Sequence, residues 1–168
     1  NMISNQVTAP VTFKGNKKIG ALSRTFTKDG EEYTEFIADK VPPMGYKFFA
    51  FEENDEAKEN VKIGNGIIEN EILKVAYDEN GILTSIFDKE NNRETLDGKG
   101  NLITVFIDKC IHETAWNLEQ NYEKKKWVLE KAESVEVTES SPVRAVLKVV
   151  RKFNKSTISQ NIILYAGS

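Results

Sequence analysis

The chain has 168 residues, of which 39% are hydrophobic and 29% are charged, and this composition is typical of a globular protein with one core, or one core and a small annex. Its net charge of -3 and pI of about 5.4 exclude the basic surface that nucleic acids or anionic membranes attract. The single cysteine, Cys110, excludes an intrachain disulfide framework.

The sequence also carries signals about location. No apolar run approaches the ~18 residues of a membrane span, and no signal peptide opens the chain. With only one cysteine, the chain is predicted to belong to a reducing compartment, the cytoplasm. It begins with Asn1 rather than a start methionine, which suits a fragment of a longer protein.

The first third of the chain predicts a small antiparallel β unit. Residues 1–10 are polar and end at Pro10, so we expect a frayed or edge segment there. Short runs of alternating apolar residues, separated by turn-forming residues, then predict four strands. These runs are residues 11–13, 19–26, 33–37 and 46–51.

The fourth run differs from the others because it is aromatic on both faces. Tyr46 and Phe48 lie on one face of the predicted strand, and Phe49 and Phe51 lie on the other. A strand that is apolar on both faces is expected to be buried on both, here at a domain contact. The acidic run at 52–60 follows and is predicted to be a linker, with a turn of helix as a weak alternative.

Residues 72–87 give the clearest local signal, that of a β-hairpin. Two runs rich in apolar and β-branched residues, 72–77 and 82–87, flank the turn at 78–81. In that turn Asn80 and Gly81 can supply the positive φ angles that a tight hairpin requires. A second polar turn, residues 88–92, follows the hairpin, and residues 101–107 predict another strand.

Residues 117–137 carry two conflicting patterns. Some apolar residues fall at helical spacing, whereas Trp127 and Leu129 alternate as in a strand. We favour a strand over 126–138, preceded by irregular chain or a short helical turn, and a helix within 117–130 stays an alternative.

The last two predicted strands are well marked. Val143, Ala145, Leu147, Val149 and Phe153 share one face of the first. Its other side carries Arg144, Lys148 and Lys152. In the final strand Ile158, Ile162 and Leu164 share a face with Gln160. The strand count predicts an all-β fold with at most one short helix.

Residues with catalytic potential are few. The one histidine, His112, lies two positions from Cys110, and side chains that share a strand face diverge; we favour a structural role, with a thiolate–imidazole pair as the alternative. No His-x-x-x-His or Cys-x-x-Cys spacing suggests a metal site, and residues 78–81 lack the alternating ligands of a calcium loop. Among 26 acidic residues, no pair stands out as the two carboxylates that a glycosidase needs.

Several segments match one known family in series. Residues 41–47 read Val-Pro-Pro-Met-Gly-Tyr-Lys, and the hairpin region spans 68–94. Further matches are Asp-Gly-Lys-Gly-Asn-Leu at 97–102, Ala-Trp at 115–116, Ser-Pro-Val-Arg-Ala at 141–145, Ser-Thr-Ile-Ser-Gln at 156–160 and Ile-Ile-Leu-Tyr at 162–165. In this order they resemble glycoside hydrolase family 38, the α-mannosidases, from a V-P-x-x-G-Y segment into the large β-sandwich domain. None of them is a catalytic motif.

The resemblance implies a parent enzyme that hydrolyses α-mannosides with retention of configuration and depends on a zinc-type divalent metal. In that family the nucleophile, the acid/base and the metal ligands lie in an N-terminal α/β barrel, which these 168 residues do not contain. We therefore expect no catalytic residue, no cofactor and no activity in this segment alone. Its expected partners are the catalytic barrel in cis and the mannoside substrate, with neither nucleic acid nor membrane.

The best candidate for sugar contact is the segment 112–117, which resembles the family's D-A-W-D segment with Thr114 and Asn117 where acids are usual. An exposed tryptophan stacks on a pyranose ring and amides bond its hydroxyls, so we predict Trp116, Asn117 and, more weakly, Tyr122 as substrate-binding residues. The alternative is that Trp116 fills the core or a domain contact.

We thus predict an all-β chain with two parts: residues 1–58, a small antiparallel β unit with the linker, and residues 59–168, the first part of an antiparallel β-sandwich of the galactose-mutarotase-like type. A carbohydrate-binding module without catalysis, built on Trp116 and Trp127, is the main alternative. A structural β domain of an unrelated protein is the other. If the chain ends at Ser168, an open edge or core face predicts self-association of the isolated fragment.

Overall fold

The computed structural model describes residues 1–51, 60–109, 116, 118–119 and 121–167. Within these residues the chain is all-β, as predicted: antiparallel strands form four sheets, and the one helical element is the 3-10 turn η1 (Tyr122–Lys124). No helix in this part of the chain has the length and apolar character needed to span a membrane. The predicted linker at 52–60 lies almost entirely outside the described residues, and the division at residue 58 stays a prediction.

The N-terminal sheet contains three antiparallel strands in the order β1-β3-β2. Its strands are β1 (Val7–Lys14), β2 (Ser23–Lys28) and β3 (Glu31–Val41). They confirm the first three predicted strands, although β1 begins inside the segment expected to be frayed or at an edge, and is indeed an edge strand. Asp29 and Gly30 both have positive φ, as the tight β2–β3 turn requires.

The fourth predicted strand is wrong. Residues 46–51 pair with no described strand and instead cross the N-terminal sheet as irregular chain. The ring of Phe49 packs edge-on against Phe36 at 5.2 Å between centroids. Tyr46 and Phe48 pack on each other but stay 77% and 87% exposed. Phe51 lies against Phe13 but is still 59% exposed, so the expected burial of both faces does not occur within the described chain.

A five-stranded antiparallel sheet in the order β4-β5-β6-β7-β8 begins the second half. Its strands are β4 (Lys62–Gly64), β5 (Ile67–Glu69), β6 (Leu73–Tyr77), β7 (Leu83–Asp88) and β8 (Arg93–Glu94). Strands β6 and β7 form the predicted hairpin. Gly81 supplies its positive φ of 67°, and Asn80 does not have positive φ. The Asp78 carboxylate instead accepts the amides of Asn80 and Ile82 and fixes the turn.

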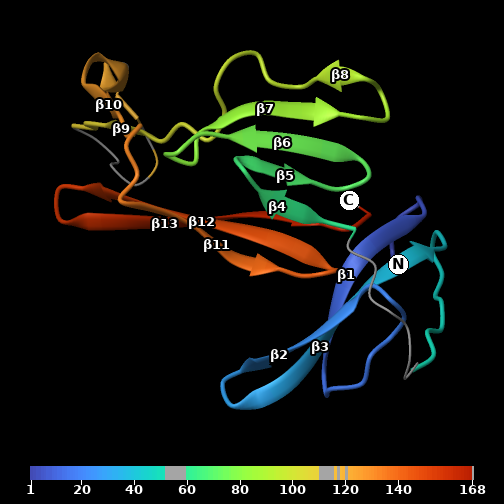
Figure 1. Cartoon of the computed structure of the whole chain (residues 1–168). Helices are drawn as coiled ribbons and strands as arrows, with labels where there is room; N and C mark the ends of the chain where they lie inside the picture. Colours follow the sequence, from blue (N-terminus) through green and yellow to red (C-terminus); the bar gives the residue numbers. More distant parts are fainter. Residues whose placement is uncertain (52–59, 110–115, 117, 120, 168) are drawn as a thin grey trace.

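A three-stranded sheet, β11-β12-β13, packs against this five-stranded sheet to form a sandwich (Figure 1). Its strands are β11 (Ser134–Ser140), β12 (Arg144–Phe153) and β13 (Ser156–Tyr165). Ile68 and Val75 from one sheet meet Leu147, Val149 and other buried residues of the second. Ile37 of β3 belongs to the same apolar cluster, so the N-terminal sheet contributes to this core.

The strand predicted over 126–138 is two strands in different sheets. Its first residues form β10 (Lys126–Val128), which pairs with β9 (Thr104–Phe106) in a separate two-stranded sheet. After the amide of Leu129 bonds to the carbonyl of Ile103, the chain turns and enters β11 at Ser134. The sequence could not show this break because apolar alternation resumes on the far side of it. Among the described residues of 117–130, the only helical element is η1.

Candidate functional site

The two-stranded sheet β9–β10 and the turn η1 position Tyr122, one of the three residues predicted to bind substrate. The ring of Tyr122 packs edge-on against Phe106 of β9, with 5.2 Å between centroids. Its hydroxyl donates to the Glu123 carboxylate at 3.1 Å. That hydrogen bond, and the negative charge of Glu123, raise the pKa of Tyr122 above its ordinary value of 10.0. The phenol therefore stays protonated near neutral pH and can donate or accept a hydrogen bond.

Tyr122 lines an open pocket of about 320 Å³, near the lower end of the volumes found for small-ligand sites. The described lining combines one aromatic ring, one aliphatic side chain, an amide and charged groups: Ile107, Lys109, Glu119, Asn121, Tyr122, Lys124 and Lys125. An aromatic ring beside several hydrogen-bonding groups suits a polyhydroxylated ligand better than a purely apolar one. The sequence did not identify Asn121 as a pocket residue, because its neighbours carry no periodic pattern.

Trp116 is 89% exposed, so it fills neither the core nor a contact within this chain. It therefore has the exposure that ring stacking on a sugar needs. The described lining of the pocket beside Tyr122 does not include it, so the structure does not bring these two residues into one site. Asn117, the third predicted residue, and Cys110 and His112 lie outside the described residues. The other tryptophan, Trp127, packs against Phe153 with 5.9 Å between centroids.

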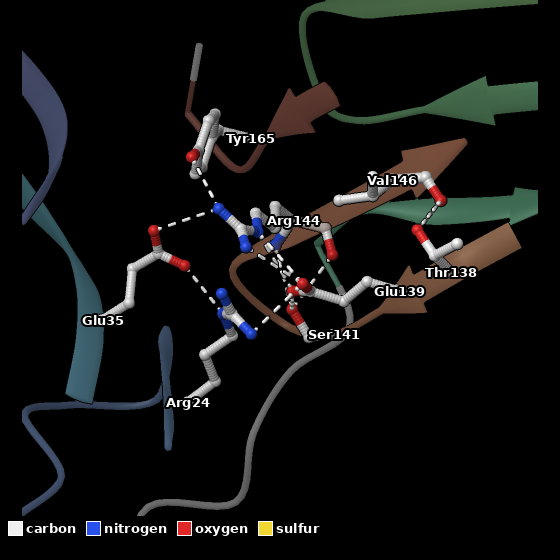
Figure 2. Close-up of polar contacts among 8 residues, drawn as sticks. All are labelled: Arg24, Glu35, Thr138, Glu139, Ser141, Arg144, Val146 and Tyr165. Carbon is white, nitrogen blue, oxygen red and sulfur yellow. Dashed lines mark hydrogen bonds and ion pairs between the residues drawn. The ribbon is translucent and has the colours of Figure 1, made fainter. Parts of the chain in front are cut away.

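A charge cluster that the sequence analysis did not identify joins the N-terminal sheet to the sandwich (Figure 2). We use "charge cluster" for Arg24, Glu35, Glu139 and Arg144. Arg24 and Glu35 are cross-strand partners on β2 and β3, and their side chains meet at 2.7 Å. Arg144 reaches Glu35 at 3.3 Å and Glu139 at 3.1 Å, and Arg24 reaches Glu139 at 3.1 Å.

The charge cluster is built for structure rather than for acid–base chemistry. Glu35 is buried, and its carboxylate forms ion pairs with both arginines. Burial disfavours the charged form of Arg144, but hydrogen bonds to Glu139 and Tyr165 and the charges of Glu139 and Glu35 outweigh this and raise its pKa. No pair of poised carboxylates results. One signal existed in the sequence: Glu35 directly precedes the apolar residues Phe36, Ile37 and Ala38 of β3.

A second buried cation, Arg151, fixes the β6–β7 turn from beneath. Its side chain lies on the core-facing side of β12, fully buried, where it donates to the carbonyl of Asn80 at 2.7 Å and to Gln160 at 2.9 Å. Burial lowers the pKa of Arg151 from its ordinary value. The side chain of Gln160 in turn donates to Asn101, and Asn101 donates to the carbonyl of Gly81. This network binds the backbone carbonyls of Asn80 and Gly81.

The described part of the chain offers no metal centre: within it, no three or more His, Cys, Asp or Glu side chains gather closely enough to hold an ion. The buried Asp88 illustrates why its acids do not act as ligands. Its two carboxylate oxygens accept the backbone and side-chain nitrogens of Asn91, which forms the turn predicted at 88–92. These hydrogen bonds hold the pKa of Asp88 below its ordinary value.

Comparison with known proteins agrees with this architecture. Residues 68–168 match the family described as Glycosyl hydrolases family 38 C-terminal domain. Alpha-mannosidase G of Dictyostelium discoideum is 32% identical over 109 residues, which cover 62% of this chain and 9% of that protein. The chain thus spans only a small part of its curated relative. Since the family match covers more than half of its residues, the chain belongs to glycosyl hydrolase family 38 and carries sequence of that family's C-terminal domain.

Proposed function

We propose that this chain is the non-catalytic β-sandwich part of a retaining, metal-dependent α-mannosidase. The observation that carries the proposal is the family match over residues 68–168, supported by the 32% identity to an α-mannosidase. The described acids also support it, because the buried ones, Glu35 and Asp88, are held in ion pairs or turns. A nucleophile, an acid/base and a zinc-type metal would then be supplied by a catalytic barrel elsewhere in the parent.

In the parent, we propose that this segment packs on the catalytic barrel and lends side chains to the rim of the substrate site. Two surfaces support this role. Tyr46 and Phe48 form an exposed aromatic pair on the N-terminal side, which suits burial against another domain. The exposed ring of Trp116 and the pocket beside Tyr122 suit contact with a mannoside. The single cysteine supports a reducing compartment, which we propose to be the cytoplasm.

Hydrolysis of an aryl α-mannoside tests whether catalysis lies in the parent's barrel and not in this chain. The 168-residue chain should release no aryl alcohol, whereas a longer parent that contains the barrel should be active and should lose that activity to a chelator until zinc is restored. Proton NMR of the first product should show the α-anomer, because the proposed mechanism retains configuration. Turnover by the 168-residue chain alone would refute the proposal.

Substitution of Trp116 in the parent enzyme tests whether this residue contacts the substrate at the rim of the active site. Trp116→Ala should raise KM for a mannoside about 10-fold, the loss expected for a stacking contact of about 1.4 kcal/mol, with kcat nearly unchanged. Leu118→Ala, at a neighbouring exposed residue, is the matched control and should change neither. Equal effects of the two substitutions would contradict a sugar contact at Trp116.

The exposure of Trp116 also favours the second candidate, a carbohydrate-binding module. Isothermal titration of the 168-residue chain with mannosides separates the two. Sub-millimolar binding that Trp116→Ala abolishes would support the module, and no binding would support the scaffold.

A further inference from the structure

Strand β13 (Ser156–Tyr165) lies at an edge of the sheet β11-β12-β13, with β12 on one side and no described strand on the other. It is ten residues long and pairs with β12 without a bulge over its whole length. Its sequence, Ser-Thr-Ile-Ser-Gln-Asn-Ile-Ile-Leu-Tyr, contains no charged residue and no proline. A long, regular and uncharged edge is the kind that pairs with another strand.

The other edges in the described part of the chain carry the usual protection against such pairing. The opposite edge of the same sheet, β11, contains Glu136 and Glu139 and has a bulge. Strand β1 contains Pro10 and ends at a lysine, and β2 contains an arginine and a lysine. Strands β4, β8, β9 and β10 have only two or three residues each. Among the described edge strands, β13 is thus the one that is long, regular and uncharged, without such protection.

Hydrogen bonding identifies which groups of β13 face the open edge. The amide of Ala166 donates to the carbonyl of Val143, so the groups of Ala166 face β12. Because the direction alternates along an antiparallel strand, Tyr165 must face away from β12. The side chain of Asn70 does reach the Tyr165 carbonyl from that side, at 2.7 Å. By the same alternation, the open groups belong to Thr157, Ser159, Asn161 and Ile163.

We propose that the occupant of this edge is a second copy of the chain, whose β13 pairs antiparallel with the first about a two-fold axis at Gln160. Asn70 already covers the Tyr165 end, so the open positions run from Thr157 to Ile163 and are symmetric about Gln160. This symmetry is what a self-complementary pairing requires. The register sets Thr157 opposite Ile163 and Ser159 opposite Asn161, and it joins the two three-stranded sheets into one of six strands.

The pairing is favourable in its details. Four residues per copy each contribute one amide and one carbonyl, so the register forms about eight new hydrogen bonds. No charged side chain lies within the paired segment, so no like charges oppose each other, although each chain carries a net charge of -3. The contact is small, because strand edges bury little surface. We therefore expect a reversible dimer with Kd of about 10–500 μM.

Sedimentation velocity and size-exclusion with light scattering on the 168-residue chain test the dimer. Reductant is present throughout, since a disulfide through Cys110 would mimic association. The wild-type mass should move from 19.0 kDa toward twice that value as concentration rises. Asn161→Lys places a lysine on the paired edge and should raise Kd at least about 10-fold. Asn161→Ser keeps the edge uncharged and should leave Kd unchanged.

Residue-resolved amide exchange then locates the contact. Raising the concentration should slow exchange at Thr157, Ser159, Asn161 and Ile163 only, because the intervening amides already bond to β12. Circular dichroism should show that Asn161→Lys remains folded. A wild-type chain that stays monomeric at millimolar concentration would overturn the proposal. So would a dimer that Asn161→Lys does not weaken, or protection that appears instead at Tyr46 and Phe48.

Discussion

The sharpest prediction concerns Gly81, where the β6–β7 turn meets strand β12. Its φ of 67° lies in the left-handed region, and a Cβ at this position would point at Val149. A Cβ added there would lie 2.4 Å from Cγ2 and 3.0 Å from Cγ1 of Val149. Val149 is fully buried in the core between the two sheets, so it cannot move aside without disturbing its neighbours.

Gly81→Ala should therefore cost free energy in two ways. Holding a residue other than glycine in the left-handed region costs about 1–2 kcal/mol. Forcing a methyl group into a packed core costs about 1–3 kcal/mol more. The sum, about 2–5 kcal/mol, is a large part of the 5–15 kcal/mol by which a typical domain is stable. We expect the midpoint of urea unfolding, followed by circular dichroism, to fall accordingly.

Gly30→Ala is the matched control. Gly30 also has positive φ, at 79°, but a Cβ there meets no atom within 4 Å. Its substitution should cost only the backbone part, about 1–2 kcal/mol. The difference between the two variants isolates the clash with the core.

A double-mutant cycle with Val149→Ala tests the cause. Val149→Ala alone should cost about 2 kcal/mol through lost burial and a small cavity. In combination with Gly81→Ala it removes the atoms that clash, so the double variant should be more stable than the sum of the single effects by about 1–3 kcal/mol. Strict additivity, or equal losses for Gly81→Ala and Gly30→Ala, would refute the reasoning.

Two further predictions concern carboxylates. Glu35→Gln should cost about 3 kcal/mol in urea unfolding, because it leaves Arg24 and Arg144 to share the single carboxylate of Glu139 in a largely buried site. Glu31→Gln, in an exposed ion pair, should cost less than about 1 kcal/mol, and equal losses would contradict the burial argument. Hydrogen bonds from the Ser85 hydroxyl and backbone amides lower the pKa of Glu94 from 4.5 to about 2. Between these values the unfolded chain binds more protons, so the stability from Glu94 is present above pH 4.5 and is lost as pH falls to 2. Thermal melts should lose part of this pH dependence in Glu94→Gln, and an unchanged slope would exclude it.

Local sequence was a good guide where short-range chemistry decides the structure. The β6–β7 hairpin, the turn at 88–92 and the faces of β12 follow from alternation and turn residues, which act over a few positions. The same rule failed for residues 46–51, whose alternating aromatics resemble a strand. Whether such a run pairs depends on an available sheet edge, and here one aromatic face instead packs across the N-terminal sheet.

At the candidate sugar site, too, the sequence predicted which residues take part but not their tertiary environment. The sequence marked Trp116 and Tyr122 through composition and family resemblance, but it left open whether Trp116 was buried. The structure shows that it is exposed, and it places Tyr122 at a pocket whose described lining comes from η1, its flanking residues and the residues that follow β9. Exposure depends on which distant segments cover a side chain, and the sequence does not encode that locally.

By itself, the sequence determined the strand-rich class, the hairpin and the family, because alternation, turn residues and ordered segments are local properties. Only the tertiary structure decided which strands lie at an edge, that Arg151 is buried beneath a turn, and that Glu35 meets Arg144 across two sheets. These features join residues up to 109 positions apart. Such contacts depend on how whole sheets pack, and the free energy of that packing is shared by many residues rather than carried by any single motif.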